Sequence, residues 1–176
     1  FTRAGKYHAW QPMAMLGHNL FGKTLGVVGV GRIGGLVARR AAAGLGMKVI
    51  YNNPKPDAPL EKDTGAQFRK LPELLREADV VSLHVPLLPS TKYLINDKTI
   101  KLMKPTAYLI NTARGPIVQE KALLKALYAK KLAGAALDVY ECEPAIDCDV
   151  SDHLELKKLP NVILTPHSAS DTWEAR

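Results

Sequence analysis

The sequence is poor in cysteine and has no long apolar run, and both absences exclude classes of protein. Its two cysteines, Cys142 and Cys148, are too few for a disulfide framework and do not form a C-x-x-C metal pattern. We therefore expect reduced thiols and a cytoplasmic location. No stretch reaches the roughly 18 uninterrupted apolar residues of a membrane helix. The mixed, partly basic residues 1–10 do not resemble a secretory signal peptide.

The chain also lacks a concentrated basic patch, although its 176 residues carry a net charge of +7. Basic residues such as Lys121 and Lys125 recur at helical spacing beside apolar residues, which is typical of solvated helix faces rather than of a nucleic-acid interface. No group of His, Cys, Asp and Glu has the spacing of metal ligands. We expect no nucleic-acid, membrane or metal partner, and we interpret the remaining histidines as structural or solvated: His8, His18, His84 and His153.

Short apolar runs alternate with amphipathic helical patterns along most of the chain. The runs are 25–30, 48–51, 80–85, 107–110, 134–137 and 162–164. The helical patterns are 33–44, 72–77, 98–102 and 119–130, whereas the proline-rich 54–59 is expected to be a loop. Strands buried on both faces and separated by helices predict an α/β fold with a doubly wound, mostly parallel sheet. Right-handed crossovers would bring the carboxyl ends of the strands, and any ligand, to one edge.

A glycine motif follows the first apolar run. Gly29, Gly31 and Gly34 have the G-x-G-x-x-G spacing that permits a tight turn, a close approach of backbone to pyrophosphate, and close packing of helix on sheet. The helix amides near Arg32 and Ile33 would hold the anion. Because a strand precedes the motif and an amphipathic helix follows it, we predict a Rossmann-type domain that binds NAD or NADP, rather than a purely structural turn.

The residue expected to bind the ribose is unusual. An Asp or Glu about 20 residues after the motif usually binds the 2′-hydroxyl of NAD, but Asn53 occupies that place. An amide still bonds a hydroxyl, yet it does not repel a 2′-phosphate, and Lys55 would attract one. The sequence therefore leaves both NAD and NADP open.

Polar residues follow each of the last three apolar runs. Arg114 comes after the fourth run, Asp138 and Glu143 after the fifth, and His167 after the sixth. At one sheet edge, a guanidinium would hold a substrate carboxylate and an imidazole would exchange a proton with a carbonyl oxygen. A carboxylate would fix the imidazole tautomer. Taken singly, each residue has a plain explanation as a turn, cap or loop residue, but the ordered set favours reduction of a 2-oxo acid.

These segments also resemble signatures of a known family. Residues 111–118, 138–144 and 165–170, together with 19–34, are similar to the D-isomer-specific 2-hydroxyacid dehydrogenases, most closely to glyoxylate and hydroxypyruvate reductases. The resemblance covers nearly the whole chain. It implies that Arg114 binds the substrate carboxylate, that His167 is the acid/base, and that Glu143 pairs with His167. It also implies cofactor contacts from Val85, Pro86, Thr91, Thr112, Ala113 and Asp138, the last of which would hold the nicotinamide carboxamide.

The resemblance further implies a domain that the sequence does not contain. Members build a substrate domain from sequence on both sides of the cofactor domain. We therefore expect residues 1–176 to be one dinucleotide-binding domain, with 1–10 and 171–176 as interdomain connections that belong to helices. We expect a homodimer, and nucleotide binding with little or no turnover by this chain alone. Two alternatives stay open: a dehydrogenase of another small anion such as phosphite, and a dinucleotide-sensing protein that resembles the family's corepressors.

Overall fold

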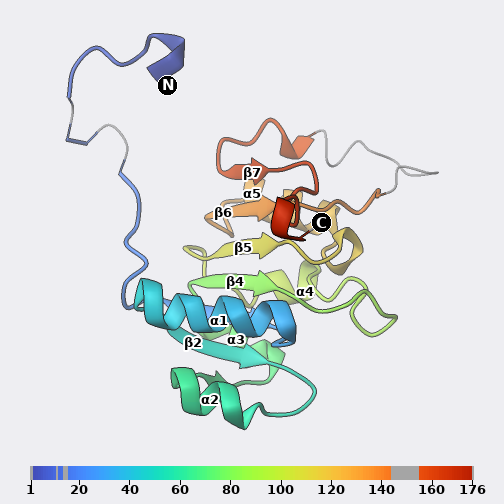
Figure 1. Cartoon of the computed structure of the whole chain (residues 1–176). Helices are drawn as coiled ribbons and strands as arrows, with labels where there is room; N and C mark the ends of the chain where they lie inside the picture. Colours follow the sequence, from blue (N-terminus) through green and yellow to red (C-terminus); the bar gives the residue numbers. More distant parts are fainter. Residues whose placement is uncertain (1, 11, 14–15, 144–154, 176) are drawn as a thin grey trace.

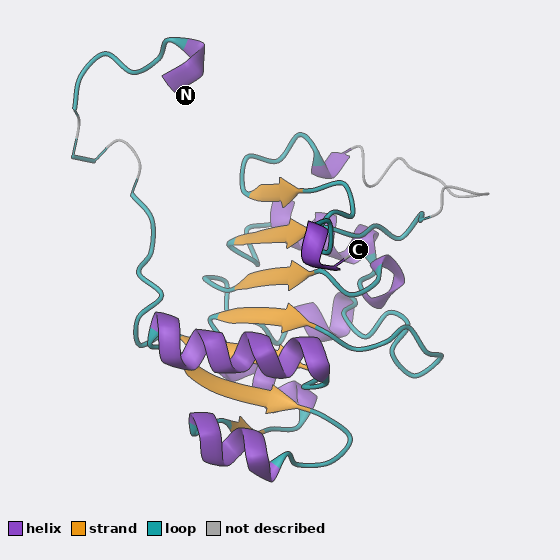
Figure 2. Cartoon of the chain, viewed as in Figure 1, coloured by secondary structure: helices purple, strands orange, loops and turns teal. Residues whose placement is uncertain are grey.

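The computed structural model describes residues 2–10, 12–13, 16–143 and 155–175. They form one seven-stranded parallel sheet with helices on both faces (Figures 1 and 2). The strands are β1 (Thr24–Val28), β2 (Lys48–Asn52), β3 (Gln67–Phe68), β4 (Val80–Leu83), β5 (Tyr108–Asn111), β6 (Gly134–Leu137) and β7 (Val162–Leu164). The helices are α1 (Arg32–Leu45), α2 (Ala58–Thr64), α3 (Leu71–Glu77), α4 (Asp97–Ile100) and α5 (Glu120–Tyr128). The predicted doubly wound α/β fold is confirmed.

The strand order is β3-β2-β1-β4-β5-β6-β7, so the sheet grows outward from β1 in both directions. Because crossovers between parallel strands are right-handed, the two directions place their helices on opposite faces. The side with α1 and α2 buries Val27, Ala41 and Leu60, and the side with α3, α4 and α5 buries Leu74, Leu109 and Leu123. Within the described residues, no α-helix covers β5–β7 on the α1 side (Figure 1).

The strand register brings the carboxyl ends to one line across the sheet. Asn52 of β2 pairs with Val28 of β1, which pairs with Leu83 of β4. The line continues from Leu83 through Asn111 and Leu137 to Leu164 of β7. Neighbouring strands lie about 4.8 Å apart, so segments that are distant in sequence leave the sheet side by side. This alignment confirms the expectation that the polar segments after the strands share one edge.

Two elements differ from the sequence-based expectations near the edge strand. Helix α2 begins at Ala58, inside the stretch expected to be a loop. Pro59 lies in its first turn, where a missing N–H costs nothing, and the Asp57 carboxylate caps it by accepting from the Leu60 amide at 3.0 Å. Strand β3 was not predicted, because two residues are too few to show a periodic pattern.

The two ends of the chain are not the helices that we expected. Thr2–Ala4 and Trp173–Ala175 are single 3-10 turns, and the rest of the described N-terminal segment is irregular. Figure 1 shows this segment running away from the sheet before β1. Its side chains are exposed, including Trp10 at 80% and Met13 at 73%. Without a partner surface, an apolar face has nothing against which to stabilise a helix.

Two carboxylates, Glu120 and Glu141, form a bracket that fixes the segment after β6. Glu120, which is only 3% exposed, accepts from the Glu141 amide at 2.5 Å, and Glu141 accepts in return from the Glu120 amide at 3.0 Å. The Tyr93 hydroxyl donates to the second Glu141 carboxylate oxygen. The bracket therefore ties residues 138–143 to the start of α5 and to the loop after β4.

This bracket makes alkaline stability depend on Tyr93. The hydrogen bond to Glu141, followed by burial, raises the pKa of Tyr93 to about 12. An unfolded tyrosine loses its proton near pH 10, about two units lower, so the folded chain binds more protons in that window and stability falls as pH rises. In Tyr93→Phe this contribution to the fall is absent. We expect the free energy of unfolding in urea to decline less steeply between about pH 10 and 12; equal slopes would contradict the bracket.

Candidate functional site

The glycine turn at the end of β1 is shaped by close backbone contacts. Gly29 has φ of 91°, and its amide donates to the Asn52 carbonyl at 2.8 Å. A Cβ on Gly29 would lie 2.9 Å from Val85 Cγ1. A Cβ on Gly34 would lie 2.0 Å from the Gly29 carbonyl oxygen, so α1 sits directly on the turn. Both positions exclude a side chain for the reasons that the motif predicted.

The start of α1 is open to a ligand. Helix α1 begins at Arg32, directly after Gly31, with no side-chain cap and no acidic residue in its first turn. A Cβ on Gly31 would have no heavy atom within 4 Å, so this side of the turn faces free space. The first amides of a helix lack intrahelical partners and carry the positive end of its dipole. The turn therefore fits a dinucleotide pyrophosphate, and the side chain of Ile33 beside it is 69% exposed.

The loop after β4 forms the neighbouring wall of the turn. Val85 packs against Gly29, and Pro86 follows it. The Thr91 hydroxyl donates to the Pro86 carbonyl at 2.6 Å and accepts from the Leu88 amide at 2.8 Å. Thr91 thus closes this loop with its own side chain, which places Val85 and Pro86 at the strand edge where a cofactor was expected.

His84, at the start of the same loop, is confirmed as a hydrogen-bonded structural residue. Its Nε2 lies 2.8 Å from the Ser82 hydroxyl, and burial lowers the pKa of its imidazole.

His167 and Glu143 meet at the far end of the same edge. His167 Nδ1 lies 2.8 Å from Glu143 Oε1, and the two side chains are 46% and 33% exposed. This contact leaves Nε2 as the ring nitrogen for a substrate oxygen. His167 has φ of 55°, a left-handed conformation that few non-glycine residues adopt. Strain of this kind persists only where the surroundings hold it.

The strained segment is held by Asp138, which is 4% exposed at the end of β6. Its carboxylate accepts from the Thr165 hydroxyl at 2.5 Å, the Ser168 amide at 2.9 Å and the Ala169 amide at 2.8 Å. Burial alone would raise the pKa of Asp138, but these hydrogen bonds outweigh it and hold the pKa below its usual value. The structure thus gives Asp138 a positioning role that the sequence did not predict.

Arg114 lies on the turn that leaves β5. The buried Asn111 shapes this turn, because its Nδ2 donates to the Arg114 carbonyl at 3.0 Å and its Oδ1 accepts from the Ala113 amide at 3.1 Å. A Cβ on Gly115 would lie 1.6 Å from the Tyr140 carbonyl oxygen, so the turn packs against residues 138–143. The Arg114 side chain is exposed and donates to the Ala113 carbonyl at 2.6 Å. Thr112 beside it is also exposed.

A continuous set of contacts therefore joins the predicted catalytic residues. The Arg114 turn touches Tyr140, the Tyr140 amide donates to Glu143 Oε2 at 3.4 Å, and Glu143 pairs with His167. Four supporting residues were missed by the sequence analysis: Tyr93, Asn111, Glu120 and Glu141. Asn111 and Glu141 lie inside recognised motifs, whereas no pattern in the sequence marks Tyr93 or Glu120.

One expectation about this segment is wrong. Cys142 was expected to be a reduced thiol, but it is buried and disulfide-bonded in the structure. A count of two cysteines does not reveal the oxidation state of either one. Cys148, Pro144 and His153 lie outside the described residues.

No three His, Cys, Asp or Glu side chains gather as metal ligands in the part of the chain that the structure describes. Within the same residues, every helix is too short or too polar to span a bilayer.

Comparisons with known proteins agree with this geometry. Residues 1–169 match the family model described as D-isomer specific 2-hydroxyacid dehydrogenase, NAD binding domain. The chain is 50% identical to a glyoxylate reductase of Thermococcus kodakarensis and 48% identical to one of Aeropyrum pernix. Both alignments cover 100% of the chain and 52% of the relative. The chain thus spans about half the length of these curated relatives.

Solved structures show the same likeness. The TT0316 protein of Thermus thermophilus has a TM-score of 0.87 at 44% identity, over 99% of this chain and 52% of that one. The D-lactate dehydrogenase of Aquifex aeolicus, complexed with NAD and lactic acid, has a TM-score of 0.88 at 37% identity, over 99% of this chain and 55% of that one. With the glycine turn, the Arg114 turn and the His167–Glu143 pair in place, the chain belongs to the D-isomer specific 2-hydroxyacid dehydrogenase family and corresponds to its NAD binding domain.

Proposed function

We propose that the protein is an oxidoreductase that transfers a hydride between NAD(P)H and a small 2-oxo acid, such as glyoxylate, hydroxypyruvate or the oxo form of a D-2-hydroxyacid. The observation that carries the proposal is the His167–Glu143 pair at 2.8 Å, on the sheet edge where the glycine turn also opens. The relatives named as glyoxylate reductases and D-lactate dehydrogenases support it. A dinucleotide sensor would need the glycine turn but not a proton donor paired with a carboxylate.

When bound, a reduced nicotinamide would supply the hydride that the carbonyl carbon accepts. Arg114 holds the substrate carboxylate with its planar guanidinium. His167 gives the proton on Nε2 to the carbonyl oxygen, so the product is the 2-hydroxy acid. Glu143 keeps the Nδ1 proton in place and stabilises the imidazolium. In the reverse direction, His167 takes the hydroxyl proton back.

The cofactor contacts follow the strand edge. The pyrophosphate would lie on the amides of Gly31, Arg32 and Ile33, and Val85, Pro86 and Thr91 would line the adenosine and phosphate side. At the other end, the backbone of Thr112 and Ala113 and the carboxylate of Asp138 would meet the nicotinamide. Asp138 then has two tasks, because it also holds residues 165–169.

We also propose that residues 1–176 are one cofactor domain that works against a separate substrate domain. The side chains of Arg114 and His167 are exposed at this edge of the sheet. Exclusion of water and alignment of the hydride with the carbonyl need a second surface over these side chains. The isolated chain therefore binds nucleotide and turns over slowly or not at all.

The catalytic assignment is tested by substitutions in the full-length protein. His167→Gln is expected to lower kcat by about 10²–10⁴-fold, because the proton donor is lost. Glu143→Gln lowers kcat as well and moves the pH profile. Neither change alters nucleotide affinity. The readout is glyoxylate-dependent loss of reduced-nicotinamide absorbance, with His8→Gln in the exposed N-terminal segment as the matched control. Undiminished turnover by His167→Gln would falsify the assignment.

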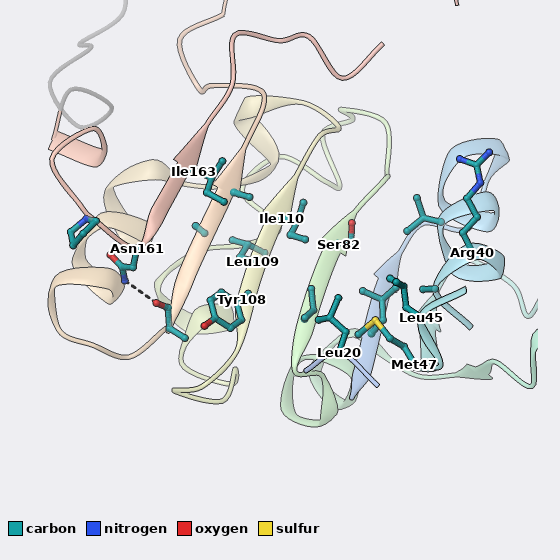
Figure 3. Close-up of a pocket in the computed structure, with 18 residues that line it drawn as sticks. Leu20, Arg40, Leu45, Met47, Ser82, Tyr108, Leu109, Ile110, Asn161 and Ile163 are labelled. Atoms are coloured by element: carbon teal, nitrogen blue, oxygen red, sulfur yellow. Dashed lines mark hydrogen bonds between the residues drawn. The ribbon is translucent and has the colours of Figure 1, made fainter. Parts of the chain in front are cut away.

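We further propose that the protein is a homodimer. The uncovered side of β5–β7 carries a hollow of about 660 Å³ lined mostly by aliphatic side chains (Figure 3). Leu45 is 49% exposed, Tyr108 38% and Ile163 67%. A single soluble chain rarely exposes a large contiguous apolar patch. A second copy would cover this face with the same face, as the isologous contact of a two-fold dimer requires.

Sedimentation equilibrium of the chain tests this arrangement. Ile163→Glu places a charge on the apolar face, so we expect it to shift the mass from dimer to monomer while the far-UV spectrum stays unchanged. Lys121→Glu, on α5 at the opposite face, is the control and leaves the dimer intact. A monomeric parent chain, or an unaltered mass for Ile163→Glu, contradicts the proposed interface.

A further inference from the structure

The residue at the ribose position is built into the glycine turn. Asn53 follows β2 directly, where the Gly29 amide donates to the Asn52 carbonyl at 2.8 Å. The half-buried Asn53 Oδ1 accepts from the Val30 amide at 3.4 Å, and its Nδ2 donates to the Lys55 carbonyl at 3.2 Å. The side chain therefore joins the turn to the loop before α2, and it does so without charge.

The lack of charge on Asn53 affects cofactor choice, because this is the position that is expected to bind the ribose. A carboxylate at this place accepts from a ribose 2′-hydroxyl and repels a 2′-phosphate. The Asn53 oxygen instead faces the Val30 amide, and its amide nitrogen is a donor that a phosphate oxygen can use. Nothing at residue 53 therefore opposes a second anion.

Two cations flank Asn53 and are available to an anion. Arg32 begins α1, two residues after Val30, and Lys55 lies two residues after Asn53; both side chains are exposed. Among the described residues, neither takes part in an ion pair. A guanidinium and an ammonium are the side chains that proteins use most often to hold phosphate.

The acidic residues of this region are already engaged. Asp57 caps α2 by accepting from the Leu60 amide at 3.0 Å. Glu61 accepts from the Tyr51 hydroxyl at 2.7 Å, and Asp63 pairs with Arg39 at 3.2 Å. These three carboxylates are thus directed to partners other than Arg32 and Lys55, which leaves both cations for a ligand anion.

We propose that this chain selects the 2′-phosphorylated dinucleotide, NADPH over NADH, with Asn53 admitting the phosphate and Lys55 and Arg32 holding it. This inference rests on the proposed function, because it assumes the dinucleotide site. It sets the chain apart from the solved relatives whose complexes contain NAD, from Lactobacillus jensenii and Aquifex aeolicus.

Titration of the chain with NADPH and with NADH, followed by nicotinamide fluorescence at low salt, tests the inference. We expect NADPH to bind at least about tenfold more tightly, since one or two charge-assisted contacts are gained. Raising the salt concentration should reduce the difference in affinity between NADPH and NADH, because salt screens the exposed contacts between the 2′-phosphate and the cations. The pair 2′,5′-ADP and 5′-ADP serves as a second probe, and the 2′-phosphorylated member should bind more tightly.

Three variants separate the residues involved. Asn53→Asp should weaken NADPH and spare or strengthen NADH, which reverses the preference. Lys55→Ala should weaken NADPH about fivefold or more and leave NADH unchanged. Lys101→Ala removes the same charge from the end of α4, on the other side of the sheet, and should alter neither affinity.

The outcomes distinguish this inference from the function on which it rests. If both nucleotides bind and NADH binds as well as or better than NADPH, the inference is wrong and the dinucleotide site stands. An unchanged ratio in both Asn53→Asp and Lys55→Ala also overturns it. If neither nucleotide binds, the dinucleotide site itself is refuted.

Discussion

The parallel register of the sheet is the constraint on which the site depends. Hydrogen bonding between neighbouring strands ends β1, β2, β4, β5, β6 and β7 on one line, from Asn52 to Leu164. The glycine turn, the Arg114 turn and the His167 segment all leave from this line. A slip of one residue in a strand would turn its side chains to the opposite face. The backbone register therefore brings the three segments of the candidate site together at one edge of the sheet.

Buried and half-buried carboxylates then fix the segments that leave the sheet. Asp138 holds residues 165–169 through three hydrogen bonds, and the pair of Glu120 and Glu141 holds residues 138–143. Because both groups accept from backbone amides, they restrain the chain as well as the side chains. This restraint offsets the cost of the left-handed conformation at His167. Rigid, largely buried residues therefore support the exposed His167–Glu143 pair, which is proposed to transfer the proton.

Much of the fold was predictable from the sequence, because most strands and helices are long enough to show a pattern of apolar residues. Strands β6 and β7 have the predicted bounds, and Gly29 and Gly34 make the close contacts that the glycine motif predicted. Helix α2 was missed because proline was taken as a breaker at a position where it begins a helix. Glu120, Glu141 and Tyr93 were missed because their partners lie 21 to 48 residues away, where no local pattern records the contact. The irregular ends likewise depend on surfaces that a sequence pattern does not show.

The central claim is that one edge holds both the dinucleotide and the proton donor. A crystal structure of the chain with bound reduced dinucleotide tests it most directly. We expect the pyrophosphate to lie on the amides after Gly31 and the nicotinamide to face His167 Nε2 across a space for one small acid. A dinucleotide bound in the apolar hollow over β5–β7, or an imidazole turned away from the nicotinamide, would contradict it.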